Sequence, residues 1–386
     1  MTHVNVSPQL LRWAAERSGL SIEMLQRRFP KLSDWVRHEG SPTLRQLEEY
    51  AKATHTPIGW MFLQEPPVER LPIPDFRATE LDRIRRPSAD LLDTVYLCQQ
   101  RQEWFRDFAR SEGLKPLVFV GSASSENGVE MTAASIRTAL GFDLNQRRED
   151  PTWTDALRRF IGQAEDLGIL VMVAGVVGSN NRRKLDPREF RGFALVDPVA
   201  PLVFINGADS KAAQMFTLAH ELAHVALGQS AVSDAQPSAL KEAVLPEERI
   251  ERWCNQVAAE LLVPLSVFRA EYRPRNEWRD EAQRLARFFK VSTLVILRRM
   301  YDAAGFTRER FWEAYEAEVE RLKVLPSGGG GDFYLTLGAR VGKRFSLAVV
   351  TSTIEGRSSF TDAFRLLGFK KMATFRALSQ DLGMRF

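Results

Sequence analysis

The chain has 386 residues, enough for two or three domains, because single hydrophobic cores seldom grow past about 250 residues. It carries 53 Lys and Arg against 49 Asp and Glu, and a net charge of +4 is too small to indicate nucleic-acid binding by bulk electrostatics. Two Cys exclude a disulfide framework and a Cys-rich zinc module, and no apolar run approaches the roughly 18 residues of a membrane span. The first residues lack a signal-peptide pattern, so we expect a cytoplasmic protein with no membrane partner.

Residues 1–75 predict a small helical domain that ends in a Pro-rich linker. Apolar residues at helical spacing are interrupted at Gly19 and Gly40, and Ser21 offers an N-cap to the segment between them. The prolines between residues 65 and 74 cannot continue a helix and indicate an extended linker. From about residue 87 to residue 165 the pattern is helical again.

Three short β-branched or aromatic runs follow and predict the strands of a small antiparallel sheet. They lie at residues 168–173, 190–196 and 201–205, separated by Gly, Pro and Asp. Helical pattern then dominates to about residue 323, and four consecutive glycines lead into a helical C-terminal module at residues 332–386. Two interpretations of this module stay open: a unit that docks a partner, and an appendage folded back on the rest of the chain.

The segment at residues 210–228 predicts a helix that carries chemistry. It contains His220, Glu221 and His224 in the pattern H-E-x-x-H. Because residues four apart lie one above the other on a helix, both imidazoles can reach one ion, and Glu221 is placed to accept a proton from water there. Two imidazoles and a carboxylate suit Zn²⁺. The alternative, two surface histidines side by side by chance, conflicts with a helix that is apolar nearly all round and therefore buried.

A third metal ligand is expected from the helix pattern at residues 246–262. Glu251 and Asn255 lie one turn apart beside small residues, which indicates two polar groups turned inward. We therefore predict Glu251 as the third ligand and Asn255 as a residue that supports it. Glu247 and Glu248 compete for the ligand role, but a solvated face suits both better.

These segments resemble the ImmA/IrrE metallopeptidases. The matching stretches are Phe190–Ala194, Phe216–His224 and Glu251–Pro264, within a similarity that covers roughly residues 130–300. The resemblance implies a zincin-like fold in which His220, His224 and Glu251 hold zinc and Glu221 is the general base. The fold class it predicts is α+β and mainly helical, with a zincin-like peptidase core flanked by an N-terminal helix-turn-helix-like module and the C-terminal helical module.

The resemblance also implies regulated proteolysis of one partner protein, of the repressor or antitoxin type. The peptidase domain is expected at residues 76–325, with a helical lead-in at 76–165, the sheet and catalytic helices at 166–265 and a helical end at 266–325. The strand at 201–205 is interpreted either as an edge that pairs with an extended substrate or as an ordinary covered strand. The rival function is an antitoxin or transcription regulator that binds a protein, or DNA, through the same fold without turnover.

Two segments raise the possibility of DNA binding, which is the weaker prediction. Residues 1–75 resemble the phage-repressor (XRE-type) helix-turn-helix, but only fourteen positions separate Ser21 from Trp35, several fewer than that module needs. Protein docking or a structural remnant fits this part better. Residues 285–300 have helix-turn-helix spacing and basic side chains that could meet phosphates, although such motifs also serve packing alone. Those basic side chains are Arg287, Lys290, Arg298 and Arg299.

Overall fold

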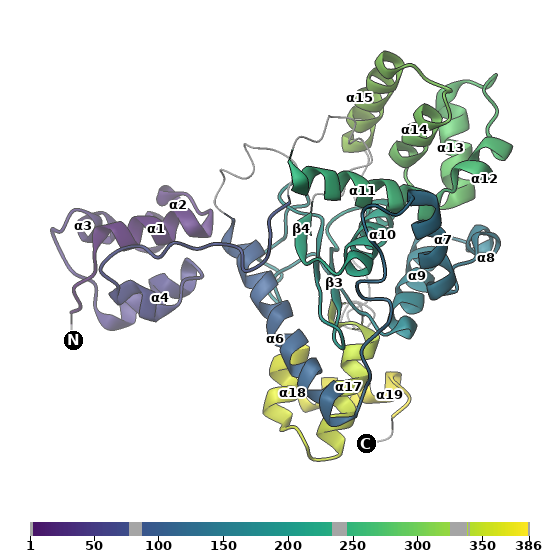
Figure 1. Cartoon of the computed structure of the whole chain (residues 1–386). Helices are drawn as coiled ribbons and strands as arrows, with labels where there is room; N and C mark the ends of the chain where they lie inside the picture. The colour runs from purple at the N-terminus through teal and green to yellow at the C-terminus, as the bar shows by residue number, and fades with distance from the viewer. Residues whose placement is uncertain (1–2, 77–86, 234–244, 325–337, 339, 385–386) are drawn as a thin grey trace. The chain divides into compact units, whose positions relative to one another are not determined.

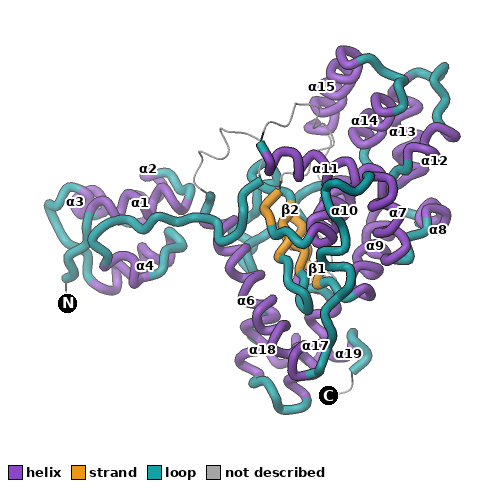
Figure 2. Tube along the Cα trace, viewed as in Figure 1, coloured by secondary structure: helices purple, strands orange, loops and turns teal. Residues whose placement is uncertain are grey.

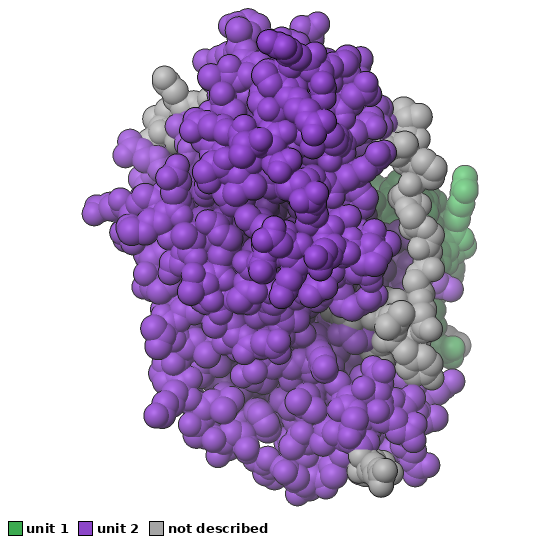
Figure 3. Space-filling model, turned by 90° about the vertical axis from the view of Figure 1, so that its right-hand side faces the viewer, with its two compact units in different colours: residues 1–72, 83–95 green, residues 73–82, 96–386 purple. Residues whose placement is uncertain are grey.

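The computed structural model describes residues 3–76, 87–233, 245–324, 338 and 340–384. The chain divides into two compact units (Figure 3). Unit 1 comprises residues 1–72 and 83–95, and unit 2 comprises residues 73–82 and 96–386. Among the helices of the described residues, none is long and apolar enough to cross a membrane.

Unit 1 is a cluster of short helices around its own apolar core. Its elements are α1 (Pro8–Ser18), α2 (Ile22–Arg28), α3 (Leu32–Val36), α4 (Leu44–Ala53) and the 3₁₀ helix η1 (Ile58–Phe62). Ser21 caps α2 as predicted, because its hydroxyl accepts the Met24 N–H at 3.3 Å. Tyr50 and Leu11 are fully buried at the centre of this core.

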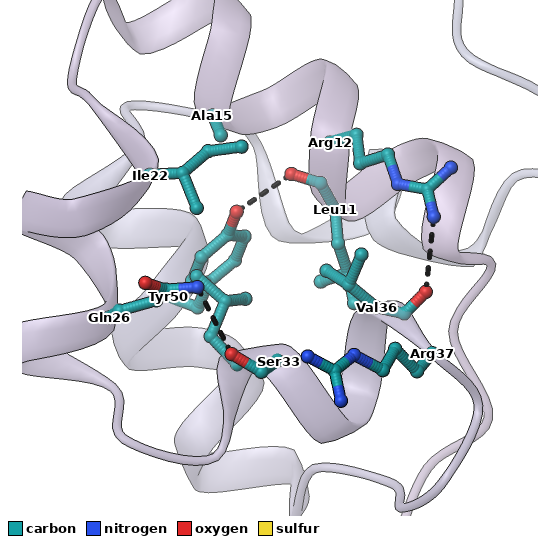
Figure 4. Close-up of a pocket in the computed structure, with 10 residues that line it drawn as sticks. Leu11, Arg12, Ala15, Ile22, Gln26, Ser33, Val36, Arg37 and Tyr50 are labelled. Atoms are coloured by element: carbon teal, nitrogen blue, oxygen red, sulfur yellow. Dashed lines mark hydrogen bonds between the residues drawn. The ribbon is translucent and has the colours of Figure 1, made fainter.

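A small pocket of about 140 Å³ lies among α1–α4 in unit 1 (Figure 4). Its polar groups bond to one another: the Tyr50 hydroxyl donates to the Leu11 carbonyl at 2.7 Å, and the Gln26 amide donates to Ser33 at 3.0 Å. None of the residues that line the pocket carries a carboxylate, an imidazole or a thiol. The pocket therefore offers no acid–base or metal chemistry of its own.

Unit 2 contains a small sheet surrounded by helices, so the predicted α+β, mainly helical fold class is confirmed (Figures 1 and 2). The helix α6 (Ala89–Ser111) begins in unit 1 and continues in unit 2 from Tyr96. The helices that follow it in unit 2 are α7 (Val129–Leu140), α8 (Leu144–Glu149), α9 (Trp153–Leu167), α10 (Lys211–Leu227), α11 (Pro246–Leu262), α12 (Leu265–Glu271), α13 (Trp278–Phe289), α14 (Thr293–Asp302), α15 (Arg308–Val324), α17 (Lys343–Ile354), α18 (Phe360–Leu367) and α19 (Met372–Asp381). The strands are β1 (Leu170–Ala174), β2 (Gly192–Leu195), β3 (Leu202–Asn206) and β4 (Ala231–Ser233).

The sheet contains all three predicted strands but is mixed rather than antiparallel. Its order is β1-β3-β2-β4, with β1 parallel to β3 and the other pairs antiparallel. The parallel pair forms because the long segment between β1 and β2 leaves room for β3 to insert between them, whereas β2 and β3 join as a hairpin. The fourth strand has only three residues, too few for a periodic signal.

The central position of β3 decides between the two interpretations of residues 201–205: they form a covered strand and not an edge. Leu202 pairs with Leu170 of β1 on one side and with Leu195 of β2 on the other. All five residues of β3 are buried, as are all five of β1. The edge of the sheet beyond β2 is formed instead by β4, whose Val232 pairs with Phe193.

The C-terminal module packs against the outer edge of β1. A Cβ atom on Gly342 would lie 2.5 Å from the Val171 carbonyl oxygen, so the backbone can approach β1 this closely only at a glycine. The Glu165 carboxylate accepts the Arg344 N–H at 3.1 Å, at the beginning of α17. Buried Arg101 of α6 donates to the Leu366 carbonyl at 3.0 Å. These contacts favour the appendage interpretation of the module.

Candidate metal centre

Helix α10 positions the H-E-x-x-H residues in the interior of unit 2. Ser210 caps its first turn by accepting the Ala213 N–H at 3.2 Å, and Gly228 ends it with a left-handed φ of 74°. The helix packs on β2 and β3 on one side and against α9 and α11 on others (Figure 1). His220, Glu221 and His224 are fully buried as a result.

The structure brings the three predicted metal-binding side chains together. The Nε2 atoms of His220 and His224 lie 3.1 Å apart. Glu251 of α11 reaches both imidazoles, with Oε1 at 3.0 Å from His224 Nε2 and Oε2 at 3.3 Å from His220 Nε2. In the part of the chain that the structure describes, this is the one cluster of three or more His, Cys, Asp or Glu side chains able to hold a metal ion.

The other polar residues predicted on α11 lie outside the cluster. Glu248 accepts the Leu245 N–H at 3.2 Å at the beginning of the helix, where Glu247 also lies in the first turn. Asn255 is buried, but its Oδ1 has no hydrogen-bond donor among the described residues. No hydrogen bond joins Asn255 to Glu251 among the described residues, so the support of Glu251 by Asn255 stays a prediction.

Glu221 is held beside the cluster through one of its two oxygens. The Ser233 hydroxyl of β4 donates to Glu221 Oε1. Gly192 of β2 faces the same oxygen, and a Cβ there would lie 3.0 Å from Oε1 and 2.5 Å from the Thr217 methyl. Glu221 Oε2 is buried and has no hydrogen-bond partner within the described residues. One oxygen is thus fixed, and the other is left for a proton.

The pKa values of Glu221 and Glu251 are shifted in opposite directions. Burial raises the pKa of Glu221 to about 8, against the opposing effects of His224 and the Ser233 hydroxyl. Burial also acts on Glu251, but the two imidazoles beside it outweigh burial and lower its pKa to about 2. A carboxylate that stays ionised and one that readily takes a proton are suited to ligand and base, respectively.

The donor set fits a tetrahedral zinc ion. Two ligand atoms about 2.05 Å from zinc lie about 3.3 Å from each other at the tetrahedral angle. The two Nε2 atoms lie 3.1 Å apart, and each lies 3.0 or 3.3 Å from one of the two Glu251 oxygens, so these distances are close to this value. The Nδ1 atoms of both histidines have no acceptor among the described residues, so the protein contacts that usually orient zinc-binding imidazoles are missing here.

Sequence reasoning missed two residues beside the cluster, Ser233 and Phe76. The Phe76 ring packs against the His224 imidazole with ring centroids 6.1 Å apart. Neither residue belongs to a motif, and only the fold brings them to the site. Tyr272, which follows the Glu251 helix in sequence, lies elsewhere: its ring stacks on Phe268 and its hydroxyl lies beside Gly305.

The helix-turn-helix-like segment at residues 285–300 forms α13 and α14, and two of its basic residues are engaged within the unit. Arg299 is buried and pairs with Glu260 at 2.8 Å, and Arg298 pairs with Asp302 at 2.8 Å. These ion pairs favour a packing role over contact with phosphates.

Residues 164–301 match the family model of peptidase M78, described as the IrrE N-terminal-like domain. The match includes the whole sheet and every residue of the cluster, and it supports the predicted relation of this part of the chain to the ImmA/IrrE peptidases. Residues 341–380 match a second model, a domain of unknown function (DUF8813). No curated protein matches the chain. The fold and site thus describe a peptidase-type domain joined to further helical parts.

Proposed function

We propose that this chain is a zinc-dependent endopeptidase that cuts a specific regulatory protein of the repressor or antitoxin type. The observation that carries the proposal is the convergence of two imidazole nitrogens and the Glu251 carboxylate beside Glu221 Oε2, which has no hydrogen-bond partner among the described residues. The match of residues 164–301 to a peptidase family supports it independently.

In this proposal His220, His224 and Glu251 hold the ion, which supplies a Lewis acid that polarises a carbonyl and lowers the pKa of water to about 7. Glu221 Oε2 takes the proton from the attacking water and later passes it to the leaving amine. Ser233 keeps the carboxylate oriented through Oε1 during both transfers. The protonated form that burial favours at Glu221 is the form that such a base must reach.

Selective cleavage suits this site better than general digestion. His220, Glu221 and His224 have no exposed surface, so a substrate must displace part of what covers them before it can be cut. The helical parts on either side of residues 164–301 provide additional surface for recognition of one partner. Zinc binding, the partner class and the restriction to the cytoplasm are parts of this proposal.

The test combines metal content with cleavage of candidate partners encoded beside the gene. We expect one zinc per chain in the wild type and in Glu221→Gln, cleavage by the wild type, and a rate about 10²- to 10⁴-fold lower in Glu221→Gln. Glu251→Gln should lose zinc, and Glu248→Gln on the same helix serves as its control. Equal amounts of fragment from wild type and Glu221→Gln would contradict the proposal, and a stable stoichiometric complex with an uncut partner would support the rival binding function.

A further inference from the structure

The outer edge of β4 is covered by an extended segment of the chain itself, residues 73–76. The Val232 N–H donates to the Pro74 carbonyl at 2.9 Å, and the Phe76 N–H donates to the Val232 carbonyl at 2.9 Å. Asp75 forms the corresponding parallel bridge with Val232. The 73–76 segment therefore continues the sheet by one short, parallel strand beyond β4.

This edge lies directly beside the site of the proposed chemistry. Val232 is followed in β4 by Ser233, which donates to Glu221. The segment also places the Phe76 ring against the His224 imidazole, where only 8% of Phe76 is exposed. The segment thus provides what a bound peptide would provide: an extended backbone on the sheet edge and an apolar side chain next to the reacting residues.

The backbone pairing of the segment with β4 is short, as an exchangeable strand requires. Pro72 and Pro74 have no N–H, so they cannot donate to a neighbouring strand, and the backbone hydrogen bonds between residues 73–76 and β4 are the two at Val232. The segment directly follows Pro72, where the first stretch of unit 1 ends.

We propose that residues 73–76 occupy the peptide-binding edge of the site as an internal competitor of the substrate. The substrate is then an extended segment of a protein that pairs with Val232 and places a large apolar side chain, preferably aromatic, where the Phe76 ring lies. This inference rests on the proposed peptidase function for its reaction but concerns peptide binding, which can be measured without cleavage.

The test uses the full chain carrying Glu221→Gln, loaded with zinc, and a fluorescent peptide with the sequence of residues 71–78 (LPIPDFRA). Fluorescence anisotropy should show at least 10-fold tighter binding when Phe76→Ala is added, because the internal competitor is weakened. The same peptide with Ala in place of Phe should bind at least 10-fold more weakly. Val68→Ala, an exposed site in the same linker region, is the matched control and should leave the affinity unchanged.

Hydrogen exchange of the same protein provides a readout that does not depend on Phe76→Ala being well folded. Saturating peptide should speed exchange at the Phe76 amide while the Val232 amide stays protected by the incoming strand. Two results would overturn the inference: retained protection of the Phe76 amide, or equal affinity for the peptide in the Glu221→Gln proteins with and without Phe76→Ala. Peptide binding without any cleavage by the wild type would uphold this inference and count against the proposed peptidase function alone.

Discussion

The asymmetry of the Glu221 carboxylate is the most informative feature at the scale of single residues. Oε1 accepts a hydrogen bond from Ser233 and is closely approached by Gly192, whereas Oε2 is buried and has no partner in the part of the chain that the structure describes. An unpaired carboxylate oxygen in the interior is costly, so it is expected where proton transfer gives it a role. The H-E-x-x-H pattern identifies Glu221 as a base, and β4 adds the group that orients it.

We predict that Ser233→Ala lowers kcat about 10-fold while KM and zinc content stay near wild type. Without the hydroxyl, Oε1 loses its hydrogen bond and the carboxylate is no longer held in one orientation. Ser233→Thr should restore much of the rate because it keeps the hydroxyl. Steady-state kinetics and metal analysis measure these effects.

Ser230→Ala is the control, because the Ser230 hydroxyl accepts the Val196 N–H at 2.8 Å rather than bonding to Glu221. A Ser233→Ala enzyme with wild-type kcat would remove Ser233 from the proposed mechanism.

At the scale of elements, the beginning of α17 is held by a buried acid. Glu165 of α9 accepts the Arg344 N–H, and burial raises the pKa of its carboxyl to about 7 even though backbone N–H groups and Lys343 oppose the shift. The N-terminal end of α17 favours the ionised form of Glu165, whereas desolvation favours its neutral form. The junction between α9 and the C-terminal module is therefore sensitive to pH.

We predict that stability falls by roughly 3 kcal/mol as the pH rises from about 4.5 to above 7. The pKa of Glu165 is about 7 in the folded chain against 4.5 for an ordinary Glu, so the folded state keeps a proton that the unfolded chain has lost. Glu165→Gln should remove this decrease, because its amide oxygen still accepts the Arg344 N–H without titrating. Urea unfolding at several pH values measures the difference.

Asp166→Asn, at the exposed neighbouring position, should keep the wild-type pH dependence. An unchanged pH dependence in Glu165→Gln would locate its source in another group.

At the scale of the whole molecule, each of the two compact units has an apolar core of its own among the described residues. The core of unit 1 is built from α1–α4 and η1, and a larger core in unit 2 surrounds α10 and α11. All residues of the candidate metal centre belong to unit 2. A bound metal ion should therefore stabilise one of the two cores and leave the other unaffected.

We predict that chelation lowers the unfolding temperature of unit 2 by about 5–10 °C and leaves that of unit 1 within about 1 °C. Thermal proteolysis read by mass spectrometry reports each unit through its own peptides. His224→Ala serves as the control, since a chain without the site should not respond to the chelator. An equal decrease in the unfolding temperature of both units, or no decrease in that of unit 2, would contradict this placement of the metal.

Local patterns were sufficient for much of the fold and for the identity of the cluster. Ser210 and Gly228 delimit α10, and the spacing of His220 and His224 places both imidazoles on one helix face. Glu251 could be chosen from its helix face because helical geometry decides which residues turn inward. These features depend on neighbours within a few positions of one another, which a sequence displays directly.

Which strands pair with one another could not be predicted from local sequence patterns. Residues 201–205 have the composition of a strand in any position, and only the insertion of β3 between β1 and β2 decides that they form the centre of the sheet. The approach of Ser233 to Glu221 and of Phe76 to His224 likewise depends on β4 and on the 73–76 segment beside it. The sequence by itself determined which residues make the candidate metal centre, because helix periodicity is local. Only the tertiary structure decided what orients and covers that centre, because contacts between distant segments depend on how the whole chain packs.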